Sequence, residues 1–232
     1  SSQMDRWGML QTGVQIDHRY PTGSVSVRFA NGEPQYEIVE NAAYDFIDAA
    51  SLKTQALSDI LYYGSLASRN PVSRAALATL INQHQGKRFV DVNLRAPWWT
   101  FDNLVPLLTG ADWVKLNEHE LHSLNPDGQP LESAMREFSR RFSLNTLIVT
   151  LGAHGALVLA NGQEILRIAP STSVEVIDTV GAGDAFAAVV MLGIQKTWPL
   201  EHILERAQHF ASAIVIAAAA ASKTCMAASA SA

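Results

Sequence analysis

Residues 178–186 read Asp-Thr-Val-Gly-Ala-Gly-Asp-Ala-Phe, a string in which polar, glycine and apolar positions follow one another closely. A run rich in β-branched residues ends at Ile177, and an apolar segment from Ala185 to Ile194 follows the glycines. This order predicts a strand, a tight turn and then a helix. Asp184 is therefore expected in the first turn of that helix.

The small residues at this turn favour the binding of an anion. Gly181, Ala182 and Gly183 let the backbone bring several N–H groups to one point, where the helix dipole adds positive potential. A carboxylate at Asp184 beside an anion suits the transfer of a phosphoryl group to a hydroxyl. The residues alone leave a second interpretation open, in which the glycines serve close packing and Asp184 only complements the helix dipole.

Composition excludes several classes of protein. Of the 232 residues, 48% are hydrophobic and 17% charged, as in ordinary globular proteins. A formal net charge of −5, with basic clusters no longer than pairs such as Lys87-Arg88, argues against a nucleic-acid partner. The longest apolar run, 213–221, is too short to cross a membrane. The single cysteine, Cys225, and the lack of a secretion-type N-terminal segment lead us to expect a cytoplasmic protein.

The pattern along the chain predicts its architecture. Two alternating segments, 24–29 and 35–39, flank Asn31-Gly32 and predict an antiparallel hairpin. The other expected strands are 60–63, 89–92, 113–116, 146–151, 156–160 and 165–168, and the expected helices are 73–84, 132–142, 184–196 and 200–216. This alternation favours a doubly wound α/β fold with a mostly parallel sheet, whose functional residues gather at the carboxyl ends of the strands.

Chemically useful residues follow four of these strands, 60–63, 89–92, 113–116 and 146–151. They are Gly64-Ser65, Asn93 and Arg95, Asn117 and Glu120, and Gly152 and Gly155. We expect them to share one cleft with residues 178–186, because parallel strands end at one edge. Other interpretations stay open: a helix-capping box for Asn117 and Glu120, a surface ion pair for Arg95, and a simple turn at Gly152.

The complete string at 178–186 resembles the C-terminal signature of the PfkB/ribokinase family of sugar kinases, Asp-Thr-x-Gly-Ala-Gly-Asp-x-Phe, at every defined position. The resemblance implies that Asp184 is the catalytic base and that Gly181–Gly183 form an anion hole. It also implies that Asp178 and Thr179 lie near the nucleotide and, in many members, near a monovalent cation such as K⁺.

Two other segments match motifs of the same family. Residues 91–95 resemble its Asp-x-Asn-x-Arg segment, which implies that Asn93 and Arg95 contact the transferring phosphate or the substrate. Residues 117–120 resemble its Asn-x-x-Glu motif, which implies that Asn117 borders the cofactor and that Glu120 helps hold Mg²⁺, through water, beside ATP.

A third segment resembles the part of the family that borders the nucleotide. Residues 150–155 match its Thr-x-Gly-x-x-Gly pattern, which implies that Thr150, Gly152 and Gly155 lie beside ATP. The similarity extends from about residue 12 to about 216, and segments such as Pro21-Thr22-Gly23 look closest to fructokinase-like members.

The resemblance also predicts the domain organisation. The hairpin matches the small β lid that covers the sugar, here at about 14–40, and that often pairs two subunits, which allows a homodimer. The family's opening strand and its sugar-gripping Asp have no counterpart. We therefore expect a single ribokinase-like domain over residues 1–232 that lacks its usual N-terminal part.

The activity implied by the resemblance is ATP-dependent transfer of a phosphoryl group to a small-molecule sugar, with fructose as the first substrate to test. The alternatives are 2-keto-3-deoxygluconate, ribose or a nucleoside on the same fold, or a non-catalytic nucleotide-binding protein. A dinucleotide-dependent oxidoreductase is disfavoured, because no Gly-x-Gly-x-x-Gly follows an early strand with an acidic residue about twenty positions on.

Overall fold

A mixed sheet forms the centre of the protein. The computed structural model describes residues 2–30, 33–52, 59–125, 127–170 and 181–229. The strands, in their order across the sheet, are β3 (Ile60–Gly64), β4 (Lys87–Asp91), β5 (Trp113–Asn117), β6 (Thr146–Thr150), β7 (Ala156–Ala160) and β8 (Ile165–Ile168). Strands β3 to β6 run parallel, whereas β7 and β8 continue the sheet antiparallel. The predicted α/β class and mostly parallel sheet are confirmed.

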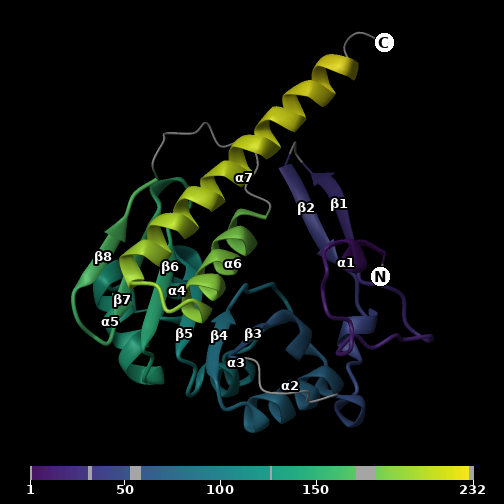
Figure 1. Ribbon diagram of the computed structural model, residues 1–232, viewed down its shortest axis with the longest axis horizontal. Helices are drawn as coiled ribbons and strands as arrows, with labels where there is room; N and C mark the ends of the chain where they lie inside the picture. The colour runs from purple at the N-terminus through teal and green to yellow at the C-terminus, as the bar shows by residue number, and fades with distance from the viewer. Residues whose placement is uncertain (1, 31–32, 53–58, 126, 171–180, 230–232) are drawn as a thin grey trace.

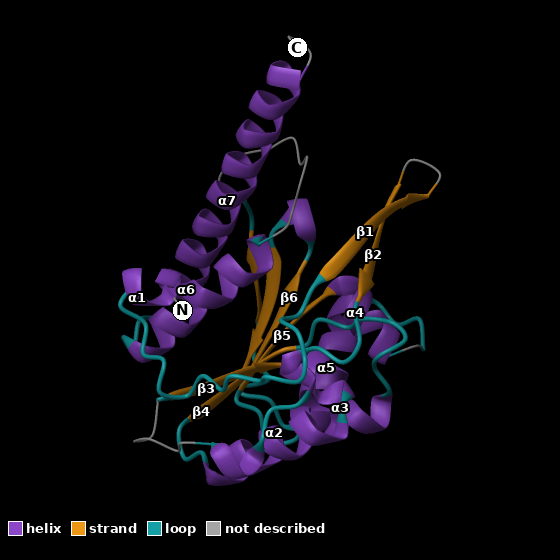
Figure 2. Cartoon of the chain, turned by 90° about the vertical axis from the view of Figure 1, so that its right-hand side faces the viewer, coloured by secondary structure: helices purple, strands orange, loops and turns teal. Residues whose placement is uncertain are grey.

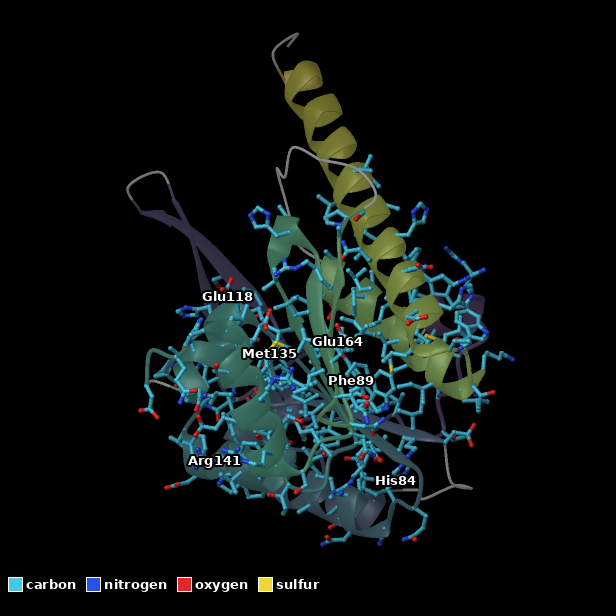
Figure 3. All side chains as sticks on the ribbon, turned by 90° about the vertical axis from the view of Figure 1, so that its left-hand side faces the viewer. His84, Phe89, Glu118, Met135, Arg141 and Glu164 are labelled. Carbon is cyan, nitrogen blue, oxygen red and sulfur yellow. The ribbon has the colours of Figure 1, made fainter. Side chains whose placement is uncertain are left out.

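Helices cover both faces of this sheet (Figure 2). One layer contains α2 (Pro71–Gln83), α3 (Phe101–Leu108), α4 (Glu118–Leu124) and α5 (Leu131–Phe142), and the other contains α6 (Ala182–Gln195) and α7 (Leu200–Ser229). Successive strand residues point to opposite faces. Phe89 therefore packs against α6 and α7 while Val90 packs toward α3 and α5. Phe89 and Met135, labelled in Figure 3, belong to the two separate cores.

Among the described helices, α1 (Ser2–Arg6) and α3 have no counterpart in the prediction, and α4 is anticipated only by the open capping-box interpretation of Asn117 and Glu120. Pro106 lies inside α3, and an interior proline argues against a helix in a sequence-based reading. Tertiary packing outweighs this signal, because Leu104, Leu107 and Leu108 are buried on the core-facing side. The Thr100 side chain also caps the helix by accepting a hydrogen bond from the backbone N–H of Asn103.

Helix α7 is longer than expected. The sequence predicts its end near residue 216, but it continues to Ser229 and projects beyond the sheet (Figure 1). Alanine has the highest intrinsic helix propensity, which suits the alanine-rich segment that extends it. Within the described residues, none of the helices combines the length and apolar character needed to cross a bilayer.

The N-terminal hairpin stands apart from the central sheet (Figures 1 and 2). Its strands are β1 (Val25–Ala30) and β2 (Glu33–Ile38), which pair antiparallel with Val25 opposite Ile38. The predicted hairpin is confirmed, with its strand bounds shifted by one or two residues.

A buried ion pair anchors the base of this hairpin. Arg69 Nη2 lies 2.7 Å from Asp45 Oδ2, and its Nε donates to Asp45 Oδ1 at 2.8 Å. The same guanidinium donates to the backbone carbonyl of Val39, just after β2, at 2.8 Å. It also lies over the Trp98 ring, 4.8 Å from the centroid. These contacts join the hairpin to the segments that follow β3 and β4.

Candidate active site

The start of α6 has the geometry predicted for the glycine turn. Gly181 is the N-cap, with a φ of 83° in the left-handed region that favours glycine, and α6 begins at Ala182. In the described part of the chain, no side chain caps this helix. The first N–H groups of a helix have no partner within it, so those of Ala182, Gly183 and Asp184 face outward. Asp184 lies in the first turn and is exposed, as expected.

The carboxyl ends of the parallel strands lie beneath this turn. Lys115 Nζ, near the end of β5, is 3.5 Å from the position that a Cβ on Gly183 would occupy. Because β3 to β6 are parallel neighbours, the residues that follow them lie along the same edge. The predicted edge therefore exists, and α6 begins over it. Asp178 and Thr179, predicted to border the nucleotide, lie outside the described residues.

A polar cluster built on the buried Asp91–Lys115 pair lies below the glycine turn. Lys115 Nζ donates to Asp91 Oδ1 at 2.8 Å and to Oδ2 at 2.7 Å, and the Tyr62 hydroxyl donates to Oδ2 at 3.1 Å. Burial raises the pKa of the Tyr62 hydroxyl, and the negative charges of Asp91 and Asp184 raise it further.

Glu120 is held by two backbone N–H groups from different segments. Its Oε2 accepts from Asn117 N at 2.8 Å and its Oε1 from Leu94 N at 2.7 Å, while Glu120 N donates to Asn117 Oδ1 at 2.8 Å. The capping-box interpretation is thus confirmed, and the same carboxylate also fastens the loop after β4. Burial raises the pKa of Glu120, partly opposed by the two N–H donors.

The surroundings of Glu120 are compatible with a water-mediated role beside magnesium. A carboxylate offers about four lone-pair sites, and Glu120 uses one on each of two N–H donors. Mg²⁺ beside phosphates keeps several waters and needs only one or two carboxylates. In the described part of the chain, no group of three or more His, Cys, Asp or Glu side chains is placed to hold a metal ion. The magnesium role of Glu120 stays a prediction.

Asn93 and Arg95 lie in the loop that follows β4. Asn93 has a φ of 46°, and both side chains are exposed. The alternative of a surface ion pair for Arg95 is not realised, since it forms none with any described carboxylate. The structure therefore leaves the Arg95 guanidinium open to solvent near the strand edge, and its contact with phosphate or substrate stays a prediction.

The glycines after β6 differ in their local roles. Gly155 has a φ of 86°, and a Cβ there would overlap the backbone carbonyl oxygen of Ile168, so packing between β7 and β8 requires glycine. Gly152, with a φ of 57°, borders open space. Thr150 ends β6 and donates through Oγ1 to the carbonyl of Leu116 at 3.4 Å. The nucleotide roles of these three residues stay predictions.

Sequence reasoning missed Lys115 and Tyr62 and assigned no role to Asp91. A signal was present, because Asp91 and Lys115 are the only charges in the apolar segments 89–92 and 113–116, at positions that alternation assigns to the face covered by α6. An isolated charge in a strand does not reveal its partner. The partner depends on strand register, which pairs Asp91 directly with Lys115.

Sequence relatives share much of this chain. It is 29% identical over 195 residues to a putative sugar kinase of Pyrococcus horikoshii, an alignment that covers 79% of this chain and 59% of the relative. It is also 29% identical to a fructokinase of Escherichia coli, in an alignment that covers 82% of this chain and 66% of the relative. An aminoimidazole riboside kinase of Salmonella typhimurium is 28% identical, with 75% of this chain and 56% of the relative covered. The chain thus spans about three-fifths of the length of these relatives.

Solved structures share the fold. The aminoimidazole riboside kinase of Salmonella enterica superposes with a TM-score of 0.78 at 22% identity, covering 92% of this chain and 73% of the other. A fructokinase of Vibrio cholerae with bound fructose, ADP and calcium superposes with a TM-score of 0.73 at 24% identity, covering 90% of this chain and 71% of the other. The sequence pattern described as pfkB family carbohydrate kinase matches residues 2–225. The glycine turn, the Asp184 helix start and the sheet edge beneath them thus lie in a chain that belongs to the pfkB family of carbohydrate kinases.

Proposed function

We propose that the full-length protein is an ATP-dependent sugar kinase that transfers the γ-phosphoryl group to a sugar hydroxyl, with fructose as the first substrate. The observation that carries this proposal is the start of α6. There the exposed Asp184 carboxylate adjoins outward-facing backbone N–H groups above the carboxyl edge of the parallel strands. A base and an anion site side by side are what this transfer requires.

The chemistry assigns a separate task to each part of the turn. Asp184 would orient the attacking hydroxyl and accept its proton, and the amides at Gly181–Gly183 would stabilise charge on the transferring phosphoryl group. Asn93 and Arg95, exposed after β4, would contact phosphate or sugar. Mg²⁺ bound with ATP would neutralise phosphate charge, and Glu120 would hold one of its waters.

Several relatives support ATP and a small sugar-like acceptor as the reactants. One solved relative contains ATP, another fructose with ADP, and a third aminoimidazole riboside with an ATP analogue. The β1–β2 hairpin would act as the lid over the sugar and as a contact between two subunits. Because the named relatives act on different substrates, the first experiment uses a panel of fructose, ribose, aminoimidazole riboside and 2-keto-3-deoxygluconate.

Release of ADP by full-length wild-type protein and by Asp184→Asn tests the proposal. We expect turnover with at least one sugar, and a kcat lowered about 10²-fold or more in the variant, the usual contribution of a general base. Asp102→Asn is the matched control, because Asp102 is also an exposed acidic residue in the first turn of a helix, α3. It should retain wild-type turnover.

Two results would contradict the proposal. Equal turnover by wild type and Asp184→Asn would remove Asp184 from the role of base. Binding of ATP by calorimetry without phosphorylation of any member of the panel would instead favour a non-catalytic nucleotide-binding protein.

A further inference from the structure

Two buried charges interrupt the apolar face of the sheet that α6 covers. Phe89 of β4 and Trp113 of β5 pack in the core beneath α6 and α7. Asp91 and Lys115 each lie two residues further along the same strands, so they share that face and lie nearer the carboxyl edge. They are direct partners in the strand register, with exposed fractions of 8% and 6%.

The geometry holds the Lys115 ammonium against the start of α6. Two of its bonds go to the Asp91 oxygens at 2.8 and 2.7 Å, and an ammonium has three donors. Among the described residues, no other acceptor binds Lys115 Nζ, which lies 3.5 Å from the Cβ position of Gly183. Tyr62 donates to Asp91 from the other side at 3.1 Å.

Stability alone does not account for this ion pair. Removing two charges from water is unfavourable, and replacing a buried pair with apolar residues of similar volume is often neutral or stabilising. This pair lies where the outward-facing N–H groups and dipole of α6 already produce positive potential. Asp91 balances the lysine charge, and the remaining ammonium donor adds to the attraction for an anion at the glycine turn.

We propose that Lys115 adds positive charge to the phosphoryl site at Gly181–Gly183, and that Asp91 and Tyr62 are positioning residues that hold its ammonium there. This inference rests on the proposed kinase function. It assigns the third ammonium donor to a phosphate oxygen of the bound nucleotide. The positioning role predicts that altering these residues weakens the binding of ligands that carry phosphate groups, without destabilising the fold.

The double variant Asp91→Asn/Lys115→Met separates these effects, because it removes both charges while nearly conserving volume. We expect full-length double variant to unfold at a wild-type temperature or above. Calorimetry should show adenosine binding unchanged and ATP binding weakened about tenfold or more, the effect of losing a charge-assisted hydrogen bond. The kcat with the preferred sugar should fall as well. A stable double variant with the wild-type ratio of ATP to adenosine affinity would overturn the inference.

Tyr62→Phe tests the inference with little risk to folding, since Tyr62 is 38% exposed and both charges remain. We expect ATP binding about two- to fivefold weaker, within the range for one lost hydrogen bond, and adenosine binding unchanged. An unchanged ATP affinity would refute the positioning role of Tyr62. If wild-type protein binds ATP and phosphorylates a sugar, an unchanged ATP affinity in these variants overturns this inference alone. If wild-type protein binds no ATP, the proposed function is overturned too.

Discussion

Replacing Arg69 with methionine tests how the β1–β2 hairpin is anchored to the rest of the protein. The Arg69 and Asp45 side chains are only 6% and 2% exposed, and they form two hydrogen bonds of 2.7 and 2.8 Å. The variant leaves the Asp45 carboxylate buried, with the backbone N–H of Ala42 at 3.1 Å as a remaining donor. Breaking a buried pair from one side lowers the free energy of unfolding by about 3–5 kcal/mol, a large share of the usual 5–15 kcal/mol.

Urea unfolding, followed by circular dichroism, measures this loss. Lys87→Met is the matched control, because it breaks the Lys87–Asp112 pair, whose side chains are 54% and 20% exposed at 3.2 Å. This more exposed pair should contribute less than about 1 kcal/mol. The double variant Asp45→Asn/Arg69→Met, in which no charge stays buried alone, should recover part of the stability. If Arg69→Met were no more destabilising than Lys87→Met, burial would not decide the strength of these pairs and the reasoning would be wrong.

Two further predictions concern the phosphoryl edge. Gly181→Ala should lower the free energy of unfolding by about 1–2 kcal/mol, because the φ of 83° at this position is strained for alanine. Gly183→Ala should change the free energy of unfolding by less than about 1 kcal/mol, because the added Cβ lies at an ordinary 3.5 Å from Lys115 Nζ. Equal shifts in Tm for the two variants would contradict this contrast. Glu120→Gln should lower the free energy of unfolding by about 1–3 kcal/mol by leaving a buried N–H unpaired. Because burial raises the pKa of Glu120, the wild-type free energy of unfolding should decline as pH rises from the ordinary glutamate pKa through the raised pKa. The difference in free energy of unfolding between wild type and Glu120→Gln should therefore narrow over the same pH range. If unfolding measured across that pH range showed this difference in free energy widening, the predicted direction of the pH dependence would be wrong.

Local backbone preferences explain why much of the site could be predicted. The glycine turn before Asp184 and the capping box of Asn117 and Glu120 depend on residues within a few positions of one another. The structure confirms both, and it also confirms the N-terminal hairpin. The prediction contains no helix at α3, where the burial of three leucines outweighs the local signal of the interior proline.

The amino-acid sequence by itself determined the alternation of strands and helices, the place of Asp184 in the first turn of a helix and the approximate positions of the strand ends. Tertiary structure decided which strand ends adjoin, since Asp91 and Lys115 are 24 residues apart in the chain and meet only through the register of β4 and β5. It likewise decided that Glu120 binds Leu94 N and that Arg69 anchors the hairpin at Asp45. The physical reason is that turns and caps act within one helical turn, whereas buried charges select their partners across the sheet, where packing and strand order bring them together.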